Sequence, residues 1–121
     1  MINRPWLANR VISPGSIILI EVIFNNDQTR KAKYRPVIVL AEVDINSSGT
    51  VDMVPLSSTA WGDDLISIEA DEDNMLSRDS SAVPSAVFSL DASDVIIRPP
   101  KGNVGEDVLN AVYEAIEDVQ G

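Results

Sequence analysis

The feature that most constrains the fold is a single change in how the apolar residues are spaced. As far as residue 100 they come in short runs rich in Ile and Val, separated by turn-forming residues such as Pro14-Gly15 and Asn46-Ser47-Ser48-Gly49. From Glu106 onward the apolar residues recur at helical spacing instead. We therefore expect a mainly β (α+β) fold, a small antiparallel β-barrel with a C-terminal α-helix on one side.

The runs predict the position of each element. The expected strands are residues 16–24, 36–43, 50–56, 65–68, 82–90 and 95–97. Residues 25–34 are polar and basic and too long for a two-residue hairpin loop, so we expect an excursion between two strands. Pro36 is then the first residue of its strand, where a missing N–H costs least.

The C-terminal segment predicts one apolar helix stripe that faces the barrel. The residues of this stripe are Val108, Leu109, Val112, Ile116 and Val119, with Ala115 alongside. No repeat or long linker divides the chain, so residues 1–121 are expected to form a single domain, with residues 1–13 as a loosely held lead-in.

The missing residue types restrict the chemistry. The chain has no cysteine and no histidine, which excludes disulfides, thiol nucleophiles, and the commonest general base and metal ligand. Any reaction must rely on Arg, Lys, carboxylates, hydroxyls or backbone amides. There is no apolar segment of the length that a signal peptide or a membrane span needs, so we expect a cytoplasmic protein without a membrane partner.

The positive charge is concentrated in one place. Nineteen acidic and nine basic residues give a formal charge of −10, which is unlike a typical nucleic-acid binder. Four of the nine positive charges nevertheless lie within six consecutive residues: Arg30, Lys31, Lys33 and Arg35. This segment is either a local anion-binding site or a solvated charged stretch before a hydrophobic strand.

Two segments can supply a phosphate site. Arg35 precedes one predicted strand, and the hydroxyl side chains of Ser57, Ser58 and Thr59 follow another. If both meet at one rim of the barrel, the guanidinium and a hydroxyl can bind a phosphodiester and stabilise the added charge of its transition state. The alternative is an arginine paired with a nearby carboxylate and a turn filled by hydroxyl residues.

Four segments resemble the MazF/PemK-like toxins of type II toxin–antitoxin systems. Residues 14–20 (Pro-Gly-Ser-Ile-Ile-Leu-Ile) look like the opening strand of that family, and residues 34–40 (Tyr-Arg-Pro-Val-Ile-Val-Leu) are similar to its Arg-Pro motif. Residues 54–58 (Val-Pro-Leu-Ser-Ser) resemble its third-strand ending, and residues 76–80 (Leu-Ser-Arg-Asp-Ser) its Leu-x-Lys/Arg-Asp-Ser segment. The match runs in order across residues 14–119.

This resemblance implies a fold and an activity. The fold is an SH3-like barrel (MazF/CcdB-like), usually a homodimer, and the activity is a sequence-selective endoribonuclease restrained by a cognate antitoxin protein. Arg35 takes the place of the catalytic arginine, and Ser57 that of the catalytic Thr or Ser, or Ser58 if the alignment shifts by one. The 2′-hydroxyl of the RNA attacks the adjacent phosphate and leaves 2′,3′-cyclic phosphate and 5′-hydroxyl ends, with no metal or cofactor.

Further residues are expected to contact RNA. The family often has Gly-x-Glu-Gln shortly before its Arg-Pro motif. This chain has Asp27-Gln28 instead, further upstream, and the resemblance implies that Asp27 acts as a base or contacts the substrate. Trp61 either stacks on an RNA base, caps the barrel or joins a dimer interface. The full expected RNA-binding set is Asp27, Gln28, Arg30, Lys31, Lys33, Ser58, Thr59 and Trp61.

The sequence is also compatible with a second function. The acidic composition favours a binding module without catalysis, either a degenerate toxin or one that acts on a protein target as the gyrase-directed CcdB relatives do. The Arg-Pro motif and the hydroxyl cluster favour the endoribonuclease.

Overall fold

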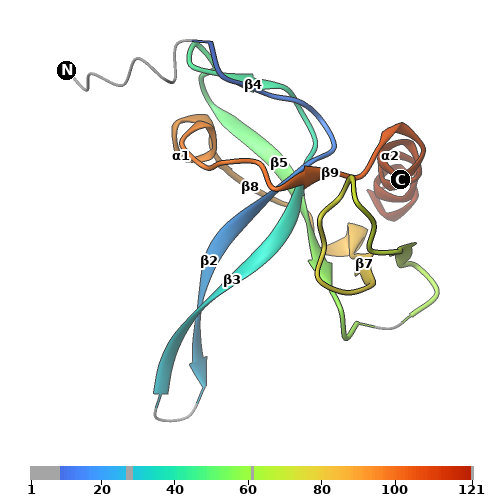
Figure 1. Cartoon of the computed structure of the whole chain (residues 1–121). Coiled ribbons are helices and arrows are strands. Elements are labelled where there is room, and N and C mark those ends of the chain that lie inside the picture. Colours follow the sequence, from blue (N-terminus) through green and yellow to red (C-terminus); the bar gives the residue numbers. More distant parts are fainter. Residues whose placement is uncertain (1–8, 27–28, 61, 121) are drawn as a thin grey trace.

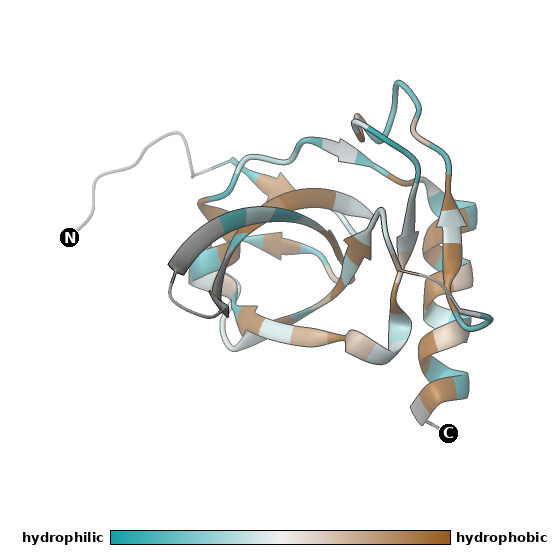
Figure 2. Cartoon of the chain, turned by 90° about the horizontal axis from the view of Figure 1, so that it is seen from below, coloured by the Kyte–Doolittle hydropathy of each residue, from teal (hydrophilic) through white to brown (hydrophobic). Residues whose placement is uncertain are grey.

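The computed structural model describes residues 9–26, 29–60 and 62–120, with the side chains of all of these except residues 22–32 and 120. In this part of the chain, seven strands form one antiparallel sheet that curls into a half-barrel (Figure 2). Its strand order is β6 (Ile66–Ile68), β7 (Ser80–Ala82), β5 (Thr50–Ser57), β3 (Thr29–Val39), β2 (Ser16–Asn26) and β9 (Gly102–Asn103), and β8 (Phe88–Asp91) also pairs with β5. With helix α2 (Glu106–Gln120) at the C-terminus, the predicted fold class is confirmed.

Both faces of the sheet are buried, which explains why its strands appear in the sequence as continuous apolar runs. Neighbouring residues on a strand point to opposite faces, so Ile17 and Ile18 enter two different cores. The core that contains Ile18 includes Val95 and Ile96 of the short helix α1 (Ala92–Ile96). The core that contains Ile17 lies under α2, which packs against the sheet on the other side (Figure 1).

The predicted helix stripe is largely confirmed. Val112 is fully buried, and Val108, Leu109 and Ile116 pack against the same core. Val119 is 49% exposed, so the stripe ends one turn earlier than its spacing indicates. In the described part of the chain, no helix is long and apolar enough to cross a lipid bilayer.

The predicted excursion at residues 25–34 is wrong. Strands β2 and β3 instead continue as a paired ribbon, and the last pair is Asn26 with Thr29. This hairpin arm extends well beyond the rest of the sheet (Figure 1). The polar composition misled the prediction because main-chain pairing does not require apolar side chains where a ribbon has left the core.

Two other strand predictions are also wrong. Residues 95–97 were expected as a strand, but Val95 and Ile96 belong to α1 and are buried in the core. The expected strand at 82–90 is divided, because the 3₁₀ turn Pro84–Ala86 separates β7 from β8. Strands β2, β5 and β6 are close to their predicted positions, whereas β3 runs from Thr29 to Val39 instead of over 36–43, and β4 (Val43–Asp44) is separate.

The end of the lead-in belongs to the fold. Residues 1–8 lie outside the described part of the chain. Residues Val11–Ile12 form β1, which pairs with β4 in a separate two-stranded sheet, and Ile12 is fully buried. The guanidinium of Arg10 donates a hydrogen bond to the carbonyl oxygen of Ile96 at 3.2 Å.

Pro36 lies inside β3 rather than at its start, and it ends one ladder of hydrogen bonds. Opposite it on β2 is Leu19, whose carbonyl oxygen accepts from Arg98 on the side away from β3. The Leu19–Pro36 pair is therefore a non-hydrogen-bonded one, so the proline nitrogen faces β5. Pairing of β3 with β5 begins only at Val37 with Pro55, because Pro36 has no N–H to extend it.

Candidate functional site

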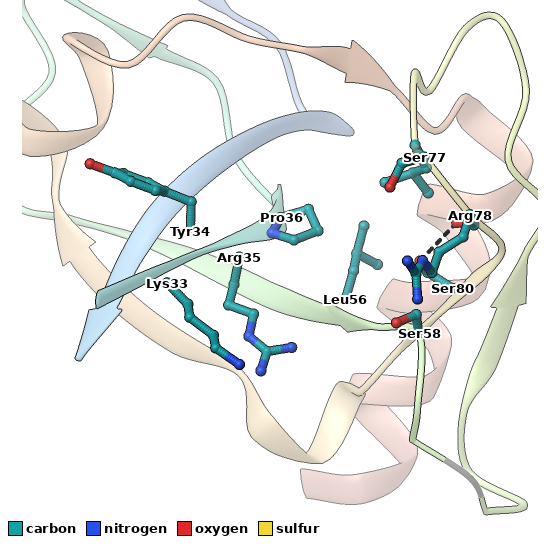
Figure 3. A pocket seen from close by; sticks show the side chains of 10 residues that line it. Lys33, Tyr34, Arg35, Pro36, Leu56, Ser58, Ser77, Arg78 and Ser80 are labelled. Atoms are coloured by element: carbon teal, nitrogen blue, oxygen red, sulfur yellow. Dashed lines mark hydrogen bonds between the residues drawn. The ribbon is translucent and has the colours of Figure 1, made fainter. Parts of the chain in front are cut away.

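A cavity of about 260 Å³ opens where the ladder between β3 and β5 has ended. One wall comes from β3, and the other from the end of β5 and from the segment that precedes β7 (Figure 3). We call it the cation-lined cavity. Its described lining residues are Lys33, Tyr34, Arg35, Pro36, Leu56, Ser58, Leu76, Ser77, Arg78 and Ser80.

Three of the nine positive charges of the chain line this one cavity: Lys33, Arg35 and Arg78. Lys33 and Arg35 are two residues apart on β3, so both point to the same face of the strand, whereas the Tyr34 ring points away (Figure 3). None of the lining residues that the structure describes is acidic, although acidic residues outnumber basic ones by nineteen to nine in the sequence. The described lining of this cavity therefore carries positive charge, although the chain as a whole is acidic.

Arg78 was not among the residues predicted to bind RNA, and the structure adds it. It faces Arg35 across the cavity, next to Ser58 (Figure 3). Ser80 donates a hydrogen bond to the carbonyl oxygen of Arg78 at 3.1 Å, which ties the segment down at the start of β7. The sequence did hold a signal, because Arg78 is one of few cations in an acidic chain and lies in one of the four family-like segments.

A buried asparagine positions the segment that carries Arg78. Asn74 is only 2% exposed. Its side-chain oxygen accepts from the backbone N–H of Asp71 and of Leu76, both at 3.0 Å, and its amide donates to the carbonyl oxygen of Glu69 at 2.8 Å. Since Leu76 lines the cavity directly, this network determines where the second wall stands.

The two candidate serines occupy different places. The Ser57 hydroxyl accepts hydrogen bonds from the backbone N–H of Thr59 at 3.2 Å and of Ala60 at 3.0 Å, so it organises the turn that follows β5. Ser58 is exposed and lines the cation-lined cavity together with Arg35. Ser57 lines the neighbouring cavity, and its hydroxyl lies 3.4 Å from that of Thr59, where either oxygen can be the donor.

The neighbouring cavity, of about 290 Å³, adjoins the first and shares Ser58 and Ser80 with it. We call it the serine-lined cavity. Its described lining residues are Ser57, Ser58, Ser67, Ile68, Glu69, Asp79, Ser80 and Ser81.

The structure does not place the remaining residues that were predicted to contact RNA among the described lining residues of either cavity. Asp27, Gln28 and Trp61 lie outside the described residues. Arg30 and Lys31 lie on the hairpin arm, paired through the backbone with Asn25 and Phe24, but their side chains are not described. Thr59 is exposed beside Ser57, with 3.4 Å between their hydroxyl oxygens, and is not among the described lining residues of either cavity.

This arrangement suits a phosphate group. A guanidinium presents a planar set of donors that fits phosphate oxygens, an ammonium adds a compact charge, and a serine hydroxyl adds a neutral donor. Cations on both walls can bind one phosphate from two sides. The open mouth between the strands also leaves room for the chain to which that phosphate belongs.

Comparisons with known proteins identify the family and the fold of the chain. A family model described as a PemK-like, MazF-like toxin of type II toxin–antitoxin systems matches residues 13–119. No curated protein matches the chain in sequence. Among solved structures, MazF from Deinococcus radiodurans (form I) is 18% identical with a TM-score of 0.65, and the match covers 93% of this chain and 99% of that one.

A second solved structure has a similar fold. The MazE–MazF crystal structure from Deinococcus radiodurans (form II) contains a chain that is 20% identical with a TM-score of 0.64, and the match covers 93% of this chain and 98% of that chain. At such identities the likeness concerns the fold alone. The family model is the comparison that reaches beyond the fold.

Proposed function

The chain belongs to the PemK-like, MazF-like toxin family of type II toxin–antitoxin systems, and we propose that it is the endoribonuclease toxin of such a system, with the cation-lined cavity as its active site. One observation carries the proposal. A chain with a formal charge of −10 gathers Lys33, Arg35 and Arg78 around one cavity whose described lining is free of carboxylates. A phosphodiester of single-stranded RNA is the ligand that such a cavity fits best.

The proposed reaction takes its nucleophile from the substrate. The 2′-hydroxyl oxygen forms a bond to the adjacent phosphorus and gives its proton to solvent water. The bond from phosphorus to the 5′-oxygen breaks and that oxygen takes a proton from Arg35, which water then protonates again. The products are 2′,3′-cyclic phosphate and 5′-hydroxyl ends. Arg35 stabilises the extra negative charge on the phosphorane and protonates the leaving oxygen, and the reaction needs neither histidine nor metal.

A serine hydroxyl binds a non-bridging oxygen in this scheme, and two serines compete for the role. Family resemblance favours Ser57, whereas the shared cavity with Arg35 favours Ser58. Losing an oxyanion donor typically lowers the rate by about 10²–10³. The serine whose replacement by alanine produces that loss in kcat is the catalytic one.

The remaining proposals concern assembly. One relative was crystallised as a MazE–MazF complex, and we propose a cognate antitoxin for this chain, bound over Arg35 and residues 25–34. We also propose a cytoplasmic homodimer. Reversing the charge of Arg30, Lys31 and Lys33 together is expected to weaken the antitoxin complex, measured by titration calorimetry, and unchanged affinity would argue against this placement.

A non-catalytic binding module is the second candidate, and the net charge of −10 is the observation that favours it. Long-range repulsion opposes RNA binding, because phosphate contacts supply much of the affinity for nucleic acids. Tight binding of a protein target such as a topoisomerase, without RNA cleavage, would establish this alternative.

The decisive experiment is cleavage of a long mixed-sequence RNA by purified protein, free of antitoxin, with EDTA present and the ends mapped by mass spectrometry. We compare the wild type with Arg35→Ala, Ser57→Ala, Ser58→Ala and the control Lys101→Ala. Lys101 is exposed and outside the described lining of both cavities, so this control loses the same charge as Arg35→Ala. Circular dichroism checks that each variant is folded.

We expect discrete cuts at a limited set of sequences, with 2′,3′-cyclic phosphate ends. Cutting should be lost in Arg35→Ala and in one serine variant, and kept in Lys101→Ala. If the folded wild type cuts no RNA across diverse substrates, the proposal fails and the binding module replaces it.

A further inference from the structure

Three serines form a row across three neighbouring strands. Ser81 of β7 is paired with Ser57 of β5 on one side and with Ser67 of β6 on the other. Because side chains alternate along a strand, these three hydroxyls share one face of the sheet. One residue away in each strand, Leu56, Ala82 and Ile66 form a matching apolar row that belongs to the core under α2.

The serine row lines the serine-lined cavity, and two carboxylates lie at its border. Asp79 accepts a hydrogen bond from the backbone N–H of Ala70 at 2.8 Å, which holds that carboxylate in place. Glu69 also lines the cavity, and its carboxylate has no hydrogen-bond or ion-pair partner among the described residues. The cavity therefore combines hydroxyls, which donate and accept, with carboxylates, which only accept.

This chemistry selects the ligand. Carboxylates repel a phosphate, so the cavity is unsuited to the RNA backbone even though it adjoins the cation-lined cavity. They attract N–H donors, and among the RNA bases guanine offers two donor groups side by side, its ring N1–H and its 2-amino group. The neighbouring 6-oxygen of guanine is an acceptor that a serine hydroxyl can bind.

We propose that the serine-lined cavity binds the guanine of a nucleotide next to the scissile phosphate, with Glu69 as the residue that accepts from the 2-amino group. The inference rests on the proposed function, because the shared residues Ser58 and Ser80 place this cavity directly beside the one assigned to the phosphate. The serine-lined cavity would then select the cut site by its base, and the cation-lined cavity would hold the adjacent phosphate at which the RNA is cut. RNA loops and single strands are commonly read in this way, through the edges of unstacked bases.

The test measures binding apart from cleavage. Fluorescence anisotropy gives the affinity of the full-length protein for three labelled pentadeoxynucleotides, which have thymidine at every position except the central one. The central base is guanine, hypoxanthine (which lacks only the 2-amino group) or adenine. Without 2′-hydroxyls none of them can be cut by the proposed reaction.

The variants are Glu69→Gln and its matched control Glu72→Gln. Both lose one negative charge from the same connection between β6 and β7, and both side chains are exposed, but Glu72 does not line the cavity. We expect the wild type and Glu72→Gln to bind the guanine pentamer about tenfold more tightly than the hypoxanthine pentamer, since one hydrogen bond to a charged acceptor is lost. Glu69→Gln keeps an amide oxygen that can still accept from the 2-amino group but loses the charge, so its preference for guanine over hypoxanthine should fall to about threefold.

Equal affinity of the wild type for all three pentamers would overturn the inference. The RNA cleavage experiment is read separately. Cutting without a guanine preference refutes only the base cavity, whereas a guanine preference without cutting refutes only the enzyme.

Discussion

Replacing Gly102 by alanine tests whether the wall that carries Arg78 is held as the structure shows. Gly102 lies in β9, where a Cβ atom would stand 2.4 Å from the carbonyl oxygen of Asn74 and 2.6 Å from that of Asp73. Non-bonded heavy atoms prefer roughly 3.5–4.0 Å. The obstacle is backbone, and the N–H of Asn103 donates to the same Asp73 oxygen at 2.9 Å, so strand and turn cannot separate without losing that bond.

The cost follows from these contacts. An added methyl group in a tightly packed place costs about 1–3 kcal/mol, and a weakened backbone hydrogen bond adds about 1 kcal/mol. We therefore expect Gly102→Ala to lower the free energy of unfolding by about 2–4 kcal/mol, a large part of the roughly 5–15 kcal/mol of a typical domain. Gly102 does not have a positive φ, so backbone strain does not contribute.

Gly49→Ala is the matched control. Gly49 has a φ of +79°, and a Cβ atom added there would meet nothing within 4 Å, so its replacement carries only the conformational penalty of about 1 kcal/mol. Urea denaturation followed by circular dichroism gives both values. If Gly102→Ala stays within about 0.5 kcal/mol of the wild type, or is less damaging than Gly49→Ala, the close packing of β9 against the Asn74 turn is refuted.

Three further outcomes are expected. Val112→Ala should cost about 2 kcal/mol in urea denaturation because Val112 is fully buried, whereas Val119→Ala at a 49% exposed position should stay within about 0.5 kcal/mol. Ser57→Ala should cost about 1 kcal/mol because its hydroxyl accepts two backbone N–H groups, and Ser58→Ala less than about half of that; equal losses would contradict the turn geometry. Arg78→Ala should weaken RNA binding about tenfold, measured by fluorescence anisotropy, because a charge-assisted hydrogen bond to the phosphate is lost; an unchanged affinity would remove Arg78 from the site.

The sequence predicted several of the strands that have a core on at least one side, but not β1, whose Ile12 is fully buried. Ser16 to Phe24, Thr50 to Leu56 and the region near Ile66 are rich in β-branched residues between turn signals, and the structure has strands at each. The free hairpin arm was missed because its second strand begins with polar and basic residues. The spacing of apolar residues indicates which side chains are buried, so a ribbon that extends away from the core has no such spacing to mark it in the sequence.

Helix α1 shows a different limit. Val95 and Ile96 are β-branched and were expected in a strand, but they belong to a short helix with Asp91 as its N-cap residue. A short apolar run has no period long enough to separate a strand from a buried helix. Tertiary packing selects the helix here, because from the helix both side chains point into the core.

The candidate site was predictable where a local pattern marked it. Arg35 beside a proline and the hydroxyls after β5 were visible, and the structure brings Arg35 and Ser58 to one cavity. The partnership of Arg78 with Arg35 was not visible, since it depends on the fold of the Asn74 turn some forty residues further along the chain. The division of roles between Ser57 and Ser58 likewise depends on two backbone hydrogen bonds that no sequence pattern specifies.

The negative charge of the whole chain disfavours RNA, whereas the positive charge lining the cation-lined cavity favours it. Which of the two dominates at the cavity depends on how far the carboxylates lie from it. At physiological salt the Debye length is about 8 Å, so exposed carboxylates beyond that range contribute little at the cation-lined cavity. Glu69 and Asp79 are the acidic residues of the adjoining cavity, where they favour the amino groups of a base and disfavour a phosphate. The remaining acidity lowers the rate of encounter with any long polyanion. Binding energy that the backbone does not supply must then come from the bases, so we expect the affinity of this chain for RNA to depend on sequence more strongly than that of a basic barrel of the same shape.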